Sequence, residues 1–115
     1  MKLRIHGDSI RLRLTQEETA ALGAGREVAY PLPIDGGPFT VWVRAGAAMS
    51  AHLEGTLMTV TVPADEARAW AESEREGLYG QSGAVRISIE KDYQCLHRPA
   101  AAQDAGAFPN PAKID

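Results

Sequence analysis

The first fourteen residues contain four cationic side chains, namely Lys2, Arg4, Arg11 and Arg13. Asp8 is the only carboxylate in this stretch. They alternate with apolar residues in two runs, and Gly7-Asp8-Ser9 between the runs is a turn sequence. If the runs pair as strands, the cations project from one face within reach of one another. Arginine forks suit phosphate and carboxylate groups. We predict an anion-binding face at Arg4, Arg11 and Arg13, although a solvated sheet face balanced by neighbouring carboxylates is the commoner arrangement.

Cys95 and His97 are the second candidate pair, because on an extended segment residues two apart point the same way. Thiolate and imidazole are zinc ligands, and the same pair offers a nucleophile and a base. A zinc site needs two further ligands, and the spacing of His6, His52 and the carboxylates supplies none. A metal-dependent or thiol enzyme using Cys95 and His97 is the alternative hypothesis. We predict no cofactor.

The elements that position these residues follow from hydrophobic periodicity. The capping box of Thr15 and Glu18 predicts a helix that ends at Gly23 or Gly25, and Pro63 opens a second helix. Glycine content predicts a flexible loop over residues 77–83. Alternation of period two predicts strands over residues 3–14 (a hairpin or one bulged strand), 28–30, 39–44, 49–53, 57–62 and 85–89.

Short strands joined by tight turns favour an α+β fold. We predict a curved or barrel-like antiparallel sheet of about six to seven strands, with two short helices covering one side. Trp42 falls on the polar phase of its strand, which predicts a second face under a helix or a binding surface. No internal repeat is apparent in the sequence.

The chain has 115 residues, which suits one domain. We place this domain at residues 1–98, followed by a proline-containing tail over residues 99–115. Composition predicts an extended or disordered tail. Its Phe108-Pro109-Asn110-Pro111 segment is pre-extended and carries one large apolar anchor, so it could also dock on the domain or on a partner.

The charge balance narrows the classes of partner. Twelve Lys and Arg oppose fifteen Asp and Glu, giving a net charge of −3, which argues against nucleic acid. No apolar run approaches the roughly 18 residues of a membrane span, and charges from Lys2 onward interrupt any signal-peptide core. The one cysteine cannot form an intramolecular disulfide. We expect a cytoplasmic protein without membrane contact.

Four blocks occur in order along nearly the whole chain: MKLRIHGDSIRLRLTQEE, VTVPADEARAW, EKDYQCL and DAGAFPNP. Together they resemble an uncharacterised family of small bacterial proteins, a domain of unknown function. The resemblance implies a bacterial cytoplasmic protein and transfers neither an activity nor site residues. It also implies that the tail is an integral part of the protein and packs on the domain.

These observations lead to three functional hypotheses. The first is a non-enzymatic binding or interaction module, in which Arg4, Arg11 and Arg13 recognise an anionic small molecule or an acidic protein surface. The second is the Cys95 and His97 enzyme. The third is an oligomeric structural protein, in which Trp42 and the tail make a subunit contact.

Overall fold

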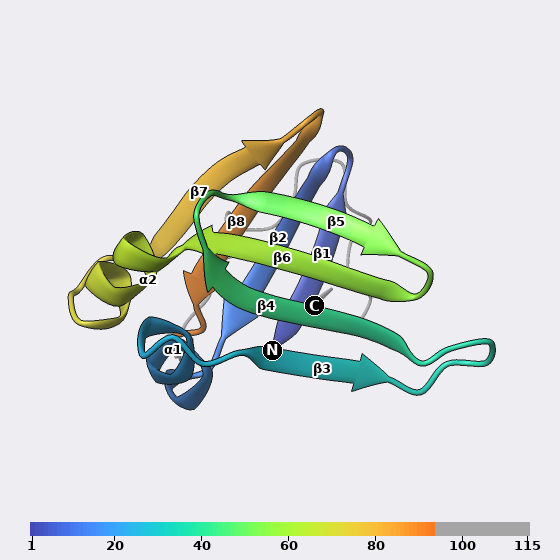
Figure 1. The fold of residues 1–115 in the computed structure, drawn as a ribbon, viewed down its shortest axis with the longest axis horizontal. Coiled ribbons are helices and arrows are strands. Elements are labelled where there is room, and N and C mark those ends of the chain that lie inside the picture. Colours follow the sequence, from blue (N-terminus) through green and yellow to red (C-terminus); the bar gives the residue numbers. More distant parts are fainter. Residues whose placement is uncertain (94–115) are drawn as a thin grey trace, which may run out of the picture.

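The computed structural model describes residues 1–93, which form eight strands and two helices (Figure 1). No helix in this part of the chain is long and apolar enough to cross a membrane. The elements follow in the order β1 (Lys2–His6), β2 (Ser9–Leu14), α1 (Gln16–Gly23), β3 (Val28–Leu32), β4 (Phe39–Gly46), β5 (Ser50–Glu54), β6 (Leu57–Pro63), α2 (Ala64–Ala71), β7 (Gly77–Ser82) and β8 (Val85–Lys91).

The strands form two four-stranded sheets rather than one. Sheet A has the order β1-β2-β8-β7, and sheet B has the order β3-β4-β6-β5. The outer pairs are antiparallel, whereas the central pairs β2/β8 and β4/β6 are parallel. The α+β class is as predicted, but the single antiparallel or barrel-like sheet of six to seven strands is wrong, and the described strands form no closed barrel. Turn residues encode hairpins, whereas nothing local encodes a parallel pairing between distant strands.

The segment predicted as a flexible loop is instead β7, which pairs with β8 along its whole length. Its glycines lowered its strand propensity. One of them is explained by a close approach from the opposite sheet's edge: a Cβ at Gly80 would lie 2.6 Å from Cγ of Met49. Gly80 therefore provides room for a side chain rather than flexibility.

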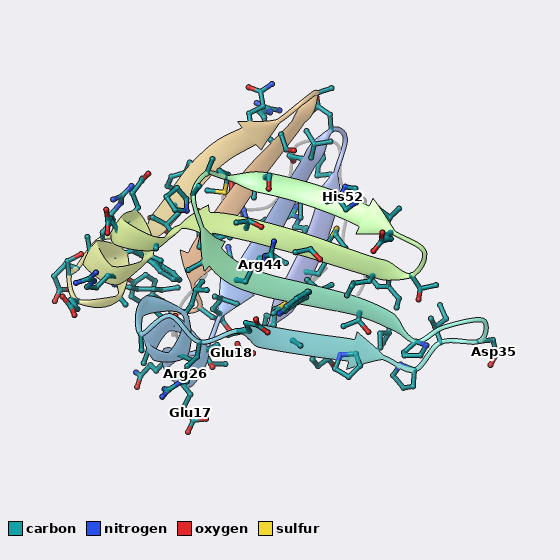
Figure 2. All side chains as sticks on the ribbon, in the orientation of Figure 1. Glu17, Glu18, Arg26, Asp35, Arg44 and His52 are labelled. Carbon is teal, nitrogen blue, oxygen red and sulfur yellow. The ribbon has the colours of Figure 1, made fainter. Side chains whose placement is uncertain are left out.

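The two sheets pack face to face with their strands crossing, and both helices lie at one end of the sandwich instead of covering one side of a sheet (Figure 1). Buried apolar side chains form the core between the layers. Glu17 and Asp35 point outward at the periphery (Figure 2). Trp70 of α2 is fully buried and donates its indole N–H to the Glu76 carbonyl at 2.9 Å. The buried apolar core comprises Leu12, Leu14, Leu22, Val28, Val41, Val43, Met58, Val60, Val62, Ala67, Trp70, Leu78, Ile87 and Ile89.

The fold contains an internal repeat that the sequence analysis missed. Residues from β1 to β4 and from β5 to β8 both run strand, strand, helix, strand, strand. The starts of β1 and β5 (2 and 50) and of α1 and α2 (16 and 64) both differ by 48 positions. Each sheet combines the first hairpin of one half with the second hairpin of the other. Identities such as Gly7 with Gly55 are too sparse to reveal the repeat without the strand order.

Candidate anion-binding face

The outer face of sheet A gathers the cations of the N-terminal hairpin. The strand register places Arg4 opposite Arg11 and Lys2 opposite Arg13. In the neighbouring β8, Ser88 lies beside Arg11 and Glu90 beside Arg13. The structure thus brings Arg4, Arg11 and Arg13 together, as the alternation predicted. We call the following residues the basic face: Lys2, Arg4, His6, Ser9, Arg11, Arg13, Arg86, Ser88 and Glu90.

Glu90 anchors the centre of the basic face. It is only 8% exposed, and its Oε1 lies 3.4 Å from Nε of Arg11. Its Oε2 accepts a hydrogen bond from the Tyr79 hydroxyl at 2.8 Å. This contact is made through Nε, so neither terminal nitrogen of the Arg11 guanidinium takes part in it.

Tyr79 supports this arrangement from β7. Burial of its hydroxyl, together with the hydrogen bond to Glu90, raises the pKa of Tyr79 to about 12. The phenol therefore stays protonated and donates at neutral pH. A Cβ at Gly77 would lie 2.7 Å from the Tyr79 hydroxyl and 2.8 Å from Cγ of Glu90, so the glycine leaves room for this contact.

Carboxylates balance part of the basic face. Lys2 lies 3.0 Å from Asp92, and Arg86 lies 3.4 Å from Asp8. The Arg86–Asp8 pair is exposed on both sides and is of the kind that contributes little to stability, whereas Asp92 in the other pair is half-buried. Within residues 1–93, five Lys and Arg side chains on this face meet three carboxylates, including Glu90.

Two adjoining hollows open on the basic face. The first, about 180 Å³, is lined by Arg4, His6, Ser9, Ile10, Arg11 and Ser88. The second, about 150 Å³, is lined by Lys2, Leu3, Arg4, Arg11 and Arg13. Since both share Arg4 and Arg11, an elongated anion can reach from one hollow into the other.

The other candidate residues of the sequence analysis are Cys95, His97, the tail and Trp42. Cys95, His97 and the predicted tail lie outside the described residues. Among residues 1–93, no three His, Cys, Asp or Glu side chains gather where they could hold a metal ion.

Trp42 lies beside Arg44, whose guanidinium carbon is 5.4 Å from the centre of the indole ring. The indole Nε1 of Trp42 donates a hydrogen bond to Glu27 at 3.0 Å. Trp42 is half-buried on β4.

Sequence reasoning did not connect β8 to the basic face, so it missed Ser88 and Glu90, and it also missed Tyr79, which holds Glu90 from β7. The alternation over residues 85–90 does place Ser88 and Glu90 on one polar phase. It does not show that β8 lies parallel to β2, which is what brings Glu90 to Arg11. Tyr79 was hidden in the segment predicted as a loop.

The comparisons with known proteins give a family and no activity. The model of a family described as a family of unknown function (DUF7009) matches residues 1–112, nearly the whole chain. This match confirms the resemblance to an uncharacterised domain family. No curated protein matches the chain.

Proposed function

The chain belongs to DUF7009, a family of unknown function, and we propose that it is a binding module for a small molecule with two anionic groups. The observation that supports this proposal is the pair of adjoining hollows that share Arg4 and Arg11. Shared arginines allow one molecule to occupy both.

The first anionic group would lie in the hollow of Arg4, Arg11 and Ser88. Glu90 engages Nε of Arg11 and so fixes the plane of the guanidinium, with its terminal nitrogens left for an oxyanion. Charge-assisted hydrogen bonds of this kind are about twice as strong as neutral ones. Ser88 adds a hydroxyl, and His6 lines the same hollow.

The second anionic group would lie between Lys2 and Arg13. These residues form the next cross-strand row along the sheet, two residues from Arg4 and Arg11. At about 3.4 Å per residue, the two rows are about 7 Å apart. This spacing suits charges at the two ends of a short molecule, such as a bisphosphorylated sugar or a dicarboxylate, rather than two groups on one atom.

A thermal-shift panel tests the proposal with inorganic phosphate, hexose monophosphates, hexose bisphosphates and short dicarboxylates. A ligand at about 100 times its Kd stabilises the folded state by about 2.7 kcal/mol. That corresponds to a rise in Tm of about 10 °C or more for a domain of this size. We expect the ligands with two anionic groups to exceed the matched single-group ones.

Arg11→Ala and Arg13→Ala should each reduce this shift. Arg68→Ala is the matched control, because the Arg68 side chain is exposed on α2 and lies 3.8 Å from Asp65, away from both hollows. A panel without any shift, or shifts that survive Arg11→Ala, would contradict the proposal.

A further inference from the structure

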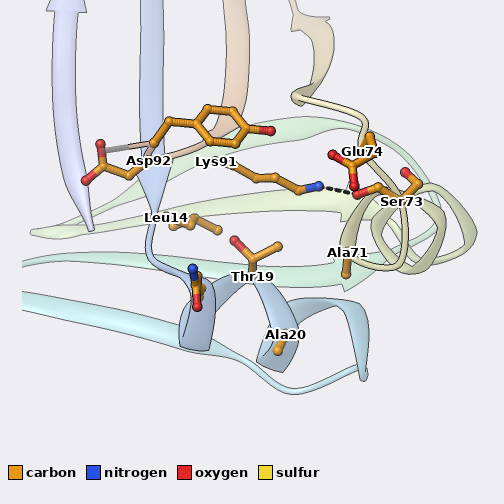
Figure 3. A pocket seen from close by; sticks show the side chains of 10 residues that line it. Leu14, Thr19, Ala20, Ala71, Ser73, Glu74, Lys91 and Asp92 are labelled. Atoms are coloured by element: carbon orange, nitrogen blue, oxygen red, sulfur yellow. Dashed lines mark hydrogen bonds between the residues drawn. The ribbon is translucent and has the colours of Figure 1, made fainter. Parts of the chain in front are cut away.

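A separate cleft of about 340 Å³ opens at the helical end of the molecule (Figure 3). It lies between α1, the segment after α2 and the end of β8. Leu14, Ala20 and Ala71 form its apolar lining, whereas Gln16, Thr19 and Lys91 bring polar groups to it. None of these residues lines either hollow of the basic face.

Thr19 is the first sign of a ligand in this cleft. The residue is only 6% exposed, and its Oγ1 is buried without a hydrogen-bond partner in the described part of the chain. Buried polar groups without partners are rare in folded proteins. In Figure 3 the Thr19 side chain rises from α1 toward Lys91, so the unsatisfied hydroxyl faces the cleft.

Lys91 is the second sign. Its Nζ donates to the Ser73 carbonyl at 2.6 Å, and its backbone N–H donates to the Glu76 carbonyl at 3.0 Å. An ammonium has three donors, so two remain after the bond to Ser73. Within residues 1–93, no carboxylate forms an ion pair with Lys91. The neighbouring Asp92 pairs with Lys2 instead.

The internal repeat provides a comparison within the same molecule. The equivalent cleft, in which the two halves exchange roles, has a volume of about 300 Å³ and includes Gly23, Ala45 and Ala64 in its lining. By the offset of 48, Ala64 corresponds to Gln16 and the buried Ala67 to Thr19.

Strand register extends the correspondence to Lys91. Leu14 pairs with Lys91, and its counterpart Val62 pairs with Ala45. The rim of the second cleft also carries Arg68 and Glu72. The fold therefore accepts alanine at the positions of Gln16, Thr19 and Lys91, so packing alone does not require the polar groups of the first cleft.

We propose that the first cleft binds a small monocarboxylate with a short apolar body. One carboxylate oxygen accepts hydrogen bonds from Oγ1 of Thr19 and Nζ of Lys91. The apolar body lies against Leu14, Ala20 and Ala71. Glu74 and Asp92 also line the cleft. Asp92 is paired with Lys2, and the charge of Glu74 disfavours ligands with a second anionic group. The cleft volume is at the lower end of the range for small-molecule sites.

Amide chemical shifts of the full chain during titration with butyrate and benzoate test this site. The neutral amides butyramide and benzamide serve as ligand controls. We expect the carboxylates to shift the amide signals of Thr19, Ala20 and Lys91 with a Kd of about 1 mM or tighter. Thr19→Ala and Lys91→Met should each weaken binding about tenfold, since each removes a hydrogen bond to a charged group.

Stability separates a binding role from a structural one. Because the equivalent Ala67 is accommodated in the other half, Thr19→Ala should leave Tm unchanged or raise it. Arg68→Ala, in the second cleft, should leave carboxylate binding unchanged, as should Arg11→Ala on the basic face. Loss of the response in Arg11→Ala would assign it to the basic face and overturn the proposal. Equal shifts with the amides, or no shifts at all, would also overturn it.

Discussion

At the scale of single residues, the linked side chains of Tyr79, Glu90 and Arg11 determine how the Arg11 guanidinium is oriented on the basic face. Glu90 accepts from Tyr79 through one oxygen and contacts Arg11 through the other. Tyr79 keeps Glu90 oriented, and Glu90 orients Arg11. The alternation of the N-terminal hairpin predicted the grouping of the arginines, because period two fixes which side chains share a face. The roles of Glu90 and Tyr79 depend on strands more than sixty residues away, which no local pattern encodes.

The raised pKa of Tyr79 gives a pH-dependent prediction. A phenol whose pKa is about 12 in the folded state and about 10 when unfolded stabilises the protein below pH 10. That contribution is lost as the pH rises through 12. Absorbance titration at alkaline pH, with Tyr79→Phe subtracted from wild type, should show one phenol with a midpoint of about 12. A midpoint near 10 would contradict the hydrogen bond to Glu90, and Tyr30→Phe is the matched control.

At the scale of elements, α1 shows how much local sequence decides. The predicted capping box is present: Thr15 Oγ1 accepts from the Glu18 N–H at 3.2 Å, and Glu18 accepts from the Thr15 N–H at 2.9 Å. Burial acts to raise the pKa of Glu18, but these bonds and the N-terminal ammonium of Met1 outweigh it and lower the pKa overall.

The two glycines after this cap have different roles. Gly25, with φ of +86°, takes the left-handed conformation that follows a helix end. Gly23 has an ordinary φ and is instead the point where α1 approaches α2, because a Cβ there would collide with the Cβ of Ala71. Helix propensity alone would favour alanine at position 23 by about 1 kcal/mol. The contact between α1 and α2 therefore explains why position 23 is glycine. Sequence reasoning could not predict this contact.

Gly23→Ala tests this helix contact. We expect a loss of about 1 to 3 kcal/mol in the free energy of unfolding, because overpacking outweighs the gain in helix propensity. Ala71→Gly in the same chain removes the clashing methyl group and should restore part of the loss. Chemical denaturation of the single and double variants measures both effects. A single variant as stable as wild type would show that the helices are not in contact at Gly23.

At the scale of the whole molecule, the repeat explains why the fold was only partly predicted. Hairpins, caps and most strands were correct because turn residues and periodicity encode them. The sheets were wrong because each combines hairpins from both halves through the parallel pairs β2/β8 and β4/β6. The same exchange brings Glu90 to the basic face and Lys91 to the helical cleft.

Because each sheet contains one hairpin from each half, we predict that neither half folds alone. Fragments cut between Ala47 and Ala48 each retain two hairpins and one helix, but neither contains a complete sheet. We expect each fragment alone to show little secondary structure by circular dichroism. Mixing them should restore the spectrum and give a 1:1 complex by size-exclusion chromatography. A folded, monomeric first fragment would contradict the exchanged arrangement.

The most direct test of the central claim is calorimetric titration of the full chain with a hexose bisphosphate. The proposal predicts binding that is tighter than for the matching monophosphate and that weakens between about 50 and about 200 mM salt, as screening of the basic face requires. Binding should be lost in Arg11→Ala and retained in Arg68→Ala. The absence of binding to wild type, or equal binding to Arg11→Ala, would show that the outer face of sheet A is not an anion site.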